Sequence, residues 1–316
     1  MGTDWFGVEL TPLAGGYSGE TFTVGTGDDC VVLRIYRREP ARALVDASLL
    51  RLMRGLLEVP KVVDVRPASA DSPALLVTER LPGVPLDTVL REPPRRLDWE
   101  RLGLALGRVL GTLSGVPFLE SGFFTDARLT VSSGGLPHDL PEWAASHRET
   151  SRLASWPERD WQALSELVDI AQDLLDTDTA RGPARTVLAH GDFNPKNILV
   201  DPQDAVVTGL VDWEFAHAGS IHTDLGNFTR FERDDRLVQP LVEGFVDAAP
   251  GHIENPFDHG RAIDLWALIE LAGRTPPNPV CELASRLLLE QARTGRLSAW
   301  PWKGRRVDPM VAEHVS

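Results

Sequence analysis

A central stretch of the sequence carries carboxylate and amide side chains at a spacing that suits phosphoryl transfer. Asp192 and Asn197 lie five positions apart, and Asp212 follows Asn197 by fifteen positions, at the end of an apolar run. Phosphoryl transfer needs a carboxylate that orients the attacking hydroxyl and accepts its proton, and oxygen ligands that hold Mg²⁺ against the phosphates. Asp192 fits the first role. Asn197 and Asp212 fit the second, because Mg²⁺ prefers hard oxygen donors.

A hairpin is the element that must bring these side chains together. The apolar residues 198–200 and a second apolar run that ends just before Asp212 flank a turn-forming cluster at residues 201–204. This pattern is typical of two antiparallel strands joined by a turn. The strand ends then meet, so Asn197 and Asp212 become neighbours. Asp192 is expected on the loop that enters the hairpin.

The His-Gly-Asp sequence at residues 190–192, with Asn197 and the trailing Asp212, resembles the aminoglycoside phosphotransferase family. Members of this family share a two-lobed fold with protein kinases. The resemblance implies an α+β, protein-kinase-like fold with a small β-rich N-terminal lobe over residues 1–81 that binds nucleotide. It also implies a larger, mainly helical C-terminal lobe over residues 82–316 that carries the catalytic and substrate-binding residues.

Two other interpretations of this motif stay open. Asp192 and Asp212 can be ordinary carboxylates on a loop and at a strand end, because short motifs produce false matches. His190 and Asp192 can also be the metal-binding pair of a hydrolase, although no other clustered His or Cys residues supply further ligands. In the favoured interpretation, His190 supports the shape of the catalytic loop.

A glycine-rich turn near the N-terminus is predicted to approach the phosphates of a nucleotide. Residues 15–19 read Gly-Gly-Tyr-Ser-Gly and lie between short predicted strands at residues 10–13 and 20–24. Glycine lets the backbone come close to a ligand. A tight turn that requires positive φ is the plain alternative, since the pattern is not GxGxxG. The residues assigned to the nucleotide are Gly16, Ser18 and Gly19.

A third predicted strand, residues 30–36, places Val32 and Arg34 on one face, because side chains alternate along a strand. Protein kinases carry lysine at the position of Arg34, and arginine also suits phosphate oxygens. Asp46, on a helix expected from about Arg42, matches the glutamate that pairs with this cation in related sequences. We therefore predict an Arg34–Asp46 ion pair and assign Val32, Arg34 and Asp46 to the nucleotide site. A purely structural Arg34 and a solvated Asp46 are the alternatives.

Residues 74–83 resemble the interlobe hinge of the same family. An apolar strand at residues 74–78 runs through Glu79 and Leu81 into a Pro-Gly turn. By position, the Glu79 carbonyl and the Leu81 amide contact the edge of the adenine. Because backbone groups make these contacts, the sequence does not separate ATP from GTP.

A second landmark of the family follows the hairpin. Residues 218–225 form a short Gly-containing stretch that ends in Asp224-Leu225. In the family this aspartate supports the catalytic loop through hydrogen bonds with the backbone, and the resemblance gives that role to Asp224. Ser220 and Ile221 replace the usual Asp-Pro. The competing interpretation is that Asp224 caps the next helix.

Composition constrains the partners and the location. The formal net charge is −14, from 32 Lys and Arg against 46 Asp and Glu, which repels nucleic acid and favours a cationic acceptor. Two cysteines, Cys30 and Cys281, are too few for a disulfide framework and favour a reducing cytoplasm. The apolar stretch at residues 263–272 is short and contains Asp264 and Glu270, so no membrane span is expected.

The larger lobe offers many candidates for the acceptor site. Helical spacing of apolar residues predicts a core helix that begins after Asp98 as its N-cap. Carboxylates and tryptophans of this lobe can line the acceptor site, although carboxylates are usually solvated and tryptophans usually pack in the core. The candidates are Asp126, Asp139, Glu142, Glu214, Glu232, Asp234, Asp235, Trp143, Trp156, Trp161, Trp213, Trp266, Trp300 and Trp302.

Together these features predict a small-molecule kinase. The family resemblance implies that it uses Mg²⁺ and ATP or GTP to phosphorylate a hydroxyl of a small cationic antibiotic and so confers resistance. A metabolic kinase acting on choline, homoserine or a sugar is one alternative. A catalytically inactive nucleotide-binding regulator, suggested by Arg34 and the atypical glycine loop, is another, although a regulator does not need Asp192.

Overall fold

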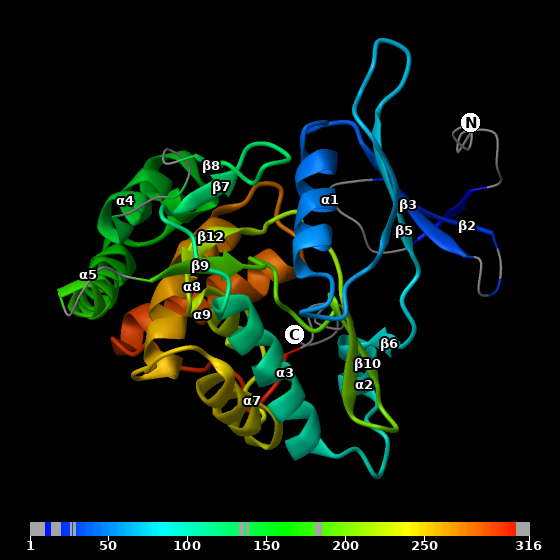
Figure 1. The fold of residues 1–316 in the computed structure, drawn as a ribbon. Helices are drawn as coiled ribbons and strands as arrows, with labels where there is room; N and C mark the ends of the chain where they lie inside the picture. Colours follow the sequence, from blue (N-terminus) through cyan, green and yellow to red (C-terminus); the bar gives the residue numbers. More distant parts are fainter. Residues whose placement is uncertain are drawn as a thin grey trace.

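The computed structural model describes residues 10–13, 20–25, 27, 30–132, 136, 139–180 and 185–307. Figure 1 shows a sheet with one helix at one end of the molecule and a mainly helical part at the other. The prediction of a β-rich N-terminal part and a larger helical C-terminal part is therefore confirmed. The boundary after residue 81 stays a prediction.

The N-terminal part is a five-stranded antiparallel sheet with one helix. Its elements are β1 (Thr11–Pro12), β2 (Glu20–Val24), β3 (Val31–Tyr36), α1 (Arg42–Met53), β4 (Val62–Arg66) and β5 (Ala74–Glu79). The strand order is β1-β2-β3-β5-β4. One face of β3 carries Leu33 and Ile35, which pack with Leu75 and Val77 of β5. The other face, which carries Tyr36, packs against α1, and it is also the face of Arg34.

The helices of the C-terminal part are α2 (Leu86–Arg91), α3 (Trp99–Ser114), α4 (Leu140–Thr150), α5 (Glu158–Ala180), α6 (Thr223–Thr229), α7 (Asp235–Ala248), α8 (Pro256–Gly273) and α9 (Pro279–Thr294). The predicted cap of α3 is present, because the Asp98 carboxylate accepts a hydrogen bond from the Arg101 amide at 3.0 Å. Helices α3 and α7 lie side by side (Figure 1). Their approach requires small residues, since a Cβ at Gly107 would overlap the backbone of α7.

Two small sheets carry the loops expected to hold the site. One contains β6 (Val84–Pro85), β10 (Ile198–Asp201) and β11 (Val206–Leu210) in the order β11-β10-β6. The other contains β7 (Gly122–Phe124), β8 (Val131–Ser132), β9 (Thr186–Ala189) and β12 (His217–Ser220) in the order β8-β7-β12-β9. The predicted hairpin is β10–β11, and its turn is fixed by the Asp201 carboxylate, which accepts from the Gln203 amide at 2.8 Å.

One apolar core continues from α1 through the β10–β11 hairpin to α3 and α7. A second core lies among α4, α5, α8 and α9. Strand β9, which precedes the catalytic loop, and the hairpin strands β10 and β11 therefore share one core with helices of both the N-terminal and the C-terminal parts. Within the stretches that the structure describes, no helix combines the length and apolar character needed to cross a bilayer.

Candidate active site

The loop of residues 190–197 joins β9 to β10 and carries the predicted catalytic aspartate. Gly191 has φ +76°, and a Cβ at this position would overlap the Phe215 carbonyl oxygen. Only glycine adopts this backbone conformation and this close approach without strain. The loop then turns tightly, because the Asn194 amide donates to the Asp192 carbonyl at 2.9 Å.

Both carboxylate oxygens of Asp192 accept hydrogen bonds from neighbouring amide side chains. Asn194 Nδ2 donates to Oδ1 at 2.6 Å, and Asn197 Nδ2 donates to Oδ2 at 2.7 Å. Lys196 Nζ lies 3.8 Å from Oδ2. The carboxylate is thus held in one orientation, and each oxygen keeps a second lone pair that can accept a proton from a substrate hydroxyl. Sequence reasoning missed Asn194, whose role depends on the fold of the loop.

Asn197 and Asp212 meet at the base of the hairpin. The Val211 amide donates to the Asn197 carbonyl at 3.0 Å, so the residue before Asp212 is bonded directly to Asn197. Asn197 Nδ2 also donates to the Asp192 carbonyl at 2.9 Å, which leaves Oδ1 as the side-chain atom for a metal. Asp212 has φ +65°, a left-handed conformation that aspartate tolerates and that concentrates at functional sites. An amide oxygen and a carboxylate fit Mg²⁺, which keeps its other positions for phosphates and water.

Asp224 lies beneath the catalytic loop. Its two carboxylate oxygens accept hydrogen bonds from the His190 and Gly191 amides, both at 2.8 Å. Burial raises the pKa of Asp224, and His190 and these two bonds oppose the rise. The competing N-cap role is wrong, because α6 begins at Thr223 and the side chain of Asp224 is directed to the loop. Asp224 therefore fixes the backbone of the two residues that precede Asp192.

His190 is fully buried and braces the same loop. Its Nε2 atom lies 3.1 Å from the Val211 carbonyl oxygen, and its ring meets Trp213 edge-to-face with centroids 4.9 Å apart. Trp213 is 3% exposed and donates from Nε1 to the Leu210 carbonyl. This histidine is part of the packing, so it does not form the metal-binding pair with Asp192 that a hydrolase would need. Trp213 adjoins Asp212 but packs in the core.

Arg34 reaches from β3 to the residues at the end of the hairpin. It forms ion pairs with Asp212, at 2.5 Å, and with Glu214. Burial opposes its charge, but Tyr36, Asp212 and Glu214 outweigh burial and raise the pKa of Arg34. Glu214 was predicted only as one of many possible acceptor-site carboxylates. Strand alternation does not link it to Asp212, because Asp212 has a left-handed backbone and Glu214 lies in a turn.

The predicted Arg34–Asp46 ion pair is wrong. Asp46 accepts hydrogen bonds from Tyr36 Oη at 2.7 Å and from Arg42 Nε at 2.6 Å. The Arg34 guanidinium lies over the Tyr36 ring, 5.2 Å from its centroid, so the tyrosine separates Arg34 from the short Asp46 side chain. Arg42 also donates to the Trp213 carbonyl oxygen. Asp46 is thus connected through Arg42 to the segment that follows Asp212. The assignment of Asp46 to the nucleotide site stays a prediction.

The remaining nucleotide assignments fall at the hinge and on β3. Val32 is half-buried on the face of β3 that Arg34 uses to reach the hairpin. The Glu79 amide donates to the Lys61 carbonyl at 2.9 Å, and the side chains of these residues pair at 3.1 Å. Leu81 follows β5 and is half-buried. The predicted residues Gly16, Ser18 and Gly19 lie outside the described residues.

Leu199 is a further candidate for the nucleotide site that the sequence analysis did not single out. It is half-buried, whereas its neighbours Ile198 and Val200 are fully buried in the core. Leu199 therefore faces the opposite side of the hairpin, where it and Leu81 both lie near Gly209. The sequence contained a signal for this position, because side chains alternate along a strand and Leu199 must point away from the side of Ile198 and Val200.

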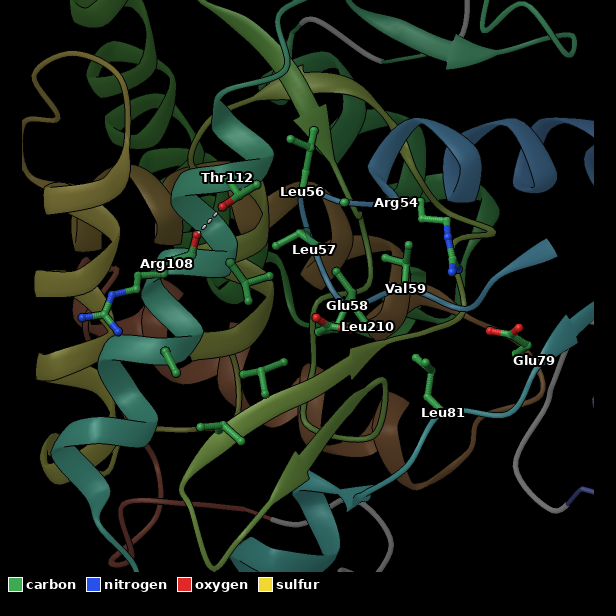
Figure 2. A pocket seen from close by; sticks show the side chains of 15 residues that line it. Arg54, Leu56, Leu57, Glu58, Val59, Glu79, Leu81, Arg108, Thr112 and Leu210 are labelled. Carbon is green, nitrogen blue, oxygen red and sulfur yellow. Dashed lines mark hydrogen bonds between the residues drawn. The ribbon is translucent and has the colours of Figure 1, made fainter. Parts of the chain in front are cut away.

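A groove of about 620 Å³ lies on the side of the hinge formed by α3 and β11. Figure 2 shows Leu57, Val59 and Leu210 inside it, with Glu79 and Leu81 at its edge. None of Arg34, Asp192, Asn197 and Asp212 lines it. The groove therefore lies apart from the catalytic loop, and it shares only Glu79 and Leu81 with the predicted nucleotide contacts.

Most of the carboxylates suggested for the acceptor site have structural partners. Asp139 and Asp234 are N-caps of α4 and α7, and Asp126 closes a turn with Thr130. Asp235 pairs with Arg305, and Glu232 is buried with Arg306 at 3.3 Å. Burial raises the pKa of Glu232 to about 7. Trp161 is buried, and Trp143, Trp156, Trp266, Trp300 and Trp302 pack partly buried against the second core.

Comparison with known proteins gives one family. Residues 9–277 match the model of the phosphotransferase enzyme family. The aminoglycoside 3'-phosphotransferase of Streptomyces ribosidificus is 30% identical over 204 residues, which cover 64% of this chain and 70% of that protein. Acyl-CoA dehydrogenase family member 11 of Gallus gallus is 38% identical over 69 residues, which cover 22% of this chain and 9% of that protein.

Solved structures show the same fold. The GDP complex of wild-type aminoglycoside 2'-phosphotransferase-IIIa has a TM-score of 0.66 at 16% identity and covers 92% of this chain and 94% of its own. A thermostable mutant of aminoglycoside phosphotransferase APH(4)-Ia, in a ternary complex with AMP-PNP and hygromycin B, has a TM-score of 0.61 at 18% identity and the same coverage. The predicted kinase-like fold and family resemblance are both confirmed.

Proposed function

The chain belongs to the phosphotransferase enzyme family, and from that premise we propose that it transfers the γ-phosphoryl group of ATP or GTP to a hydroxyl of a small-molecule antibiotic. The observation that carries this proposal is the Asp192 carboxylate, which Asn194 and Asn197 hold in one orientation. Asn197 also bonds the Asp192 carbonyl, and Val211, the residue before Asp212, bonds Asn197 across the hairpin. Such an array is what phosphoryl transfer asks of a protein, since the reaction depends mainly on positioning and charge neutralisation.

Asp192 orients the acceptor hydroxyl and accepts its proton. Its two amide bonds fix the direction of its remaining lone pairs. The loop stays in place because Asp224 holds the His190 and Gly191 amides. Preorganisation of this kind lowers the barrier, because the carboxylate does not reorient during the reaction.

Asn197 Oδ1 and the Asp212 carboxylate are the oxygen ligands for Mg²⁺. Mg²⁺ held by these two groups would supply charge neutralisation for the donor phosphates. Arg34 contacts the phosphates of the donor, and Glu214 keeps its guanidinium at the Asp212 end of the hairpin. Arginine suits this role because its planar fork bonds two oxygens at once.

The donor nucleotide lies between the sheet and the hairpin. We assign its phosphates to Gly16, Ser18 and Gly19, and its base to the Glu79 carbonyl, the Leu81 amide and the apolar side chains of Val32 and Leu199. The GDP and AMP-PNP named for the similar structures are nucleotides of the kind this arrangement holds. The antibiotic acceptor is supported by the aminoglycoside 3'-phosphotransferase relative.

An Mg²⁺-dependent transfer screen with ATP and GTP tests the proposal. The acceptors are aminoglycosides, other hydroxylated antibiotics and small metabolic alcohols, and the control is Asp192→Asn. Phosphorylation of an antibiotic by the wild type alone supports the function, and growth of an expressing host on that drug tests resistance. Transfer only to a metabolic alcohol, or no transfer at all, contradicts the antibiotic assignment.

A further inference from the structure

Among the residues that the structure describes, Arg233 is a cation of the helical part without a carboxylate partner. It lies between α6 and α7, where its backbone amide donates to the Arg305 carbonyl at 2.6 Å. Its Nε atom is buried without a hydrogen-bond partner, and its guanidinium lies over the Trp300 ring, 5.2 Å from the centroid. Within the described residues, no carboxylate oxygen lies at ion-pair distance from Arg233.

A second guanidinium adds to the positive charge at this place. Arg261 of α8 also has a buried Nε atom without a hydrogen-bond partner. Its ion pair is long, 3.3 Å to Asp258, whose side chain is 59% exposed. Burial and the charge of Arg261 together lower the pKa of Arg233 to about 10. The two cations therefore repel each other in a partly desolvated setting.

The nearby carboxylates are committed to other arginines. Asp264 attracts Arg233, but both of its oxygens bind Arg230, at 2.6 and 2.9 Å. The remaining pairs in this segment are Glu232 with Arg306, Asp234 with Arg236, and Asp235 with Arg305. Asp264 therefore offsets part of the positive charge of Arg233, but among the described residues no carboxylate forms an ion pair with it.

This cationic pair belongs to the side of the molecule that carries Asp192. Burial opposes the charge of Arg230, but Asp264 and, more weakly, Asp192 raise its pKa. Contacts place Arg233 near the same loop, because Asp224 of α6 bonds the His190 and Gly191 amides and Arg233 follows the end of this short helix by four residues. A ligand bound at Arg233 can present another of its groups toward the catalytic loop.

We infer that Arg233 and Arg261 bind an anionic group of the acceptor, a carboxylate, phosphate or sulfate. A partly compensated, partly buried charge is unfavourable, so a ligand that supplies the counter-charge relieves a cost already present in the free protein. Guanidinium groups recognise such oxyanions through paired hydrogen bonds. Phe257 and Trp300, the rings next to the two guanidiniums, hold these groups in place.

This inference rests on the proposed function, because it assigns the anion to the acceptor of that reaction. It narrows the acceptor to a hydroxylated small molecule that is anionic or zwitterionic. A purely cationic acceptor would bring positive charge to a place that already holds two guanidiniums. The overall charge of −14 attracts cations at long range but does not describe the field at this position.

The first arm of the test measures anion binding without catalysis. Thermal unfolding is followed in inorganic phosphate and in sulfate, against chloride at equal ionic strength. The proteins are the wild type, Arg233→Gln and the matched control Arg286→Gln, in which an exposed arginine over a tryptophan is removed. We expect the anions to raise the melting temperature of the wild type and the control more than that of Arg233→Gln. An equal response in all three proteins overturns the site.

The second arm measures transfer to acceptors in matched pairs that differ only in a free or an esterified carboxylate. We expect the free acid to be preferred and Arg233→Gln to raise the acceptor KM at least about 30-fold, as when a buried charge pair is broken. The nucleotide KM of Arg233→Gln should equal that of the wild type. The control Arg286→Gln should keep the wild-type preference for the free acid. Equal use of both members of a pair overturns the acceptor assignment. No transfer to any compound, with anion binding intact in the first arm, contradicts the proposed function and leaves the site standing.

Discussion

Asp224 and Arg233 are both charged groups withdrawn from water in the same helical part, but their surroundings differ completely. Asp224 accepts two backbone hydrogen bonds, and each of its oxygens has a partner in the catalytic loop. Arg233 contacts an aromatic ring and has a buried Nε atom without a partner. A satisfied buried charge holds a structure together, whereas an unsatisfied one is poised for a ligand.

The two regions should respond in opposite ways to loss of charge. Removing Asp224 leaves two amides without acceptors, so the fold and the reaction should both suffer. Removing the charge of Arg233 relieves an unfavourable situation, so the fold should tolerate it while ligand binding fails.

Asp224→Ala should have the largest effect on stability. Two hydrogen bonds to a charged group are lost, and the loss should lower the free energy of unfolding by about 3 to 5 kcal/mol. Transfer should fall with it because the backbone of Asp192 is no longer held. Urea unfolding and kcat measure the two effects. Asp224→Asn, which keeps one acceptor oxygen, is the control and should lie between the wild type and the alanine variant. A fully stable Asp224→Ala protein would remove the support role.

Arg42→Ala should come next. It leaves the Asp46 carboxylate, which is 2% exposed, without its ion pair and releases the Trp213 carbonyl. We expect a loss of about 3 kcal/mol, as for other broken buried pairs, together with a raised KM for the Mg²⁺ nucleotide because Asp212 is less well placed. Arg42→Ala combined with Asp46→Leu should recover part of the stability and none of the KM. An unchanged KM in both proteins would show that the pair is structural only.

His222 represents a third way to accommodate a buried titratable group, since it stays neutral. Burial, and then the charge of His259, lower the pKa of His222 from 6.5 to about 3, and the two rings stack with centroids 5.0 Å apart. Below pH 6.5 the unfolded chain binds a proton that the folded chain does not, so stability falls as the pH falls. From pH 7 to pH 5 this group should remove about 2 kcal/mol. Comparing urea unfolding of the wild type and His222→Phe across this range checks the prediction, and equal slopes would refute it.

Arg233→Gln should have the smallest effect on stability, within about 1 kcal/mol and possible in either direction, because a partly compensated charge is exchanged for a neutral amide. Urea unfolding at low salt measures it, with Arg230→Gln as the contrast. The Arg230 variant leaves Asp264 unpaired and should lose far more. Similar losses in the two variants would mean that Arg233 has a stabilising partner after all.

The parts of the site that the sequence predicted are those fixed by local chemistry. The turn at residues 201–204 sets the hairpin register, and the register makes Asn197 and Asp212 neighbours. Asp224 was placed by resemblance alone, and its hydrogen bonds to the loop agree with that placement. Leu199 was within reach, because strand alternation separates it from its buried neighbours.

The errors and omissions concern choices between partners that are distant in sequence. The sequence offered Arg34 and Arg42 as partners for Asp46. In the structure Asp46 bonds Tyr36 and Arg42, and the Tyr36 ring lies between Asp46 and Arg34. Arg233 was missed because the net charge counts residues and does not locate them. Whether an arginine meets a carboxylate or another arginine depends on how α6, α7 and α8 pack, which neither composition nor spacing reveals.

Asp192→Asn tests the central claim most directly, with Asp201→Asn as a matched change at the far end of the same hairpin. Single-turnover phosphoryl transfer and the nucleotide Kd are measured on both variants and on the wild type. The account predicts that Asp192→Asn loses about a thousandfold in rate with an unchanged Kd, and that Asp201→Asn behaves as the wild type. Retention of the wild-type rate in Asp192→Asn would contradict the assignment of this carboxylate as the group that orients and deprotonates the acceptor.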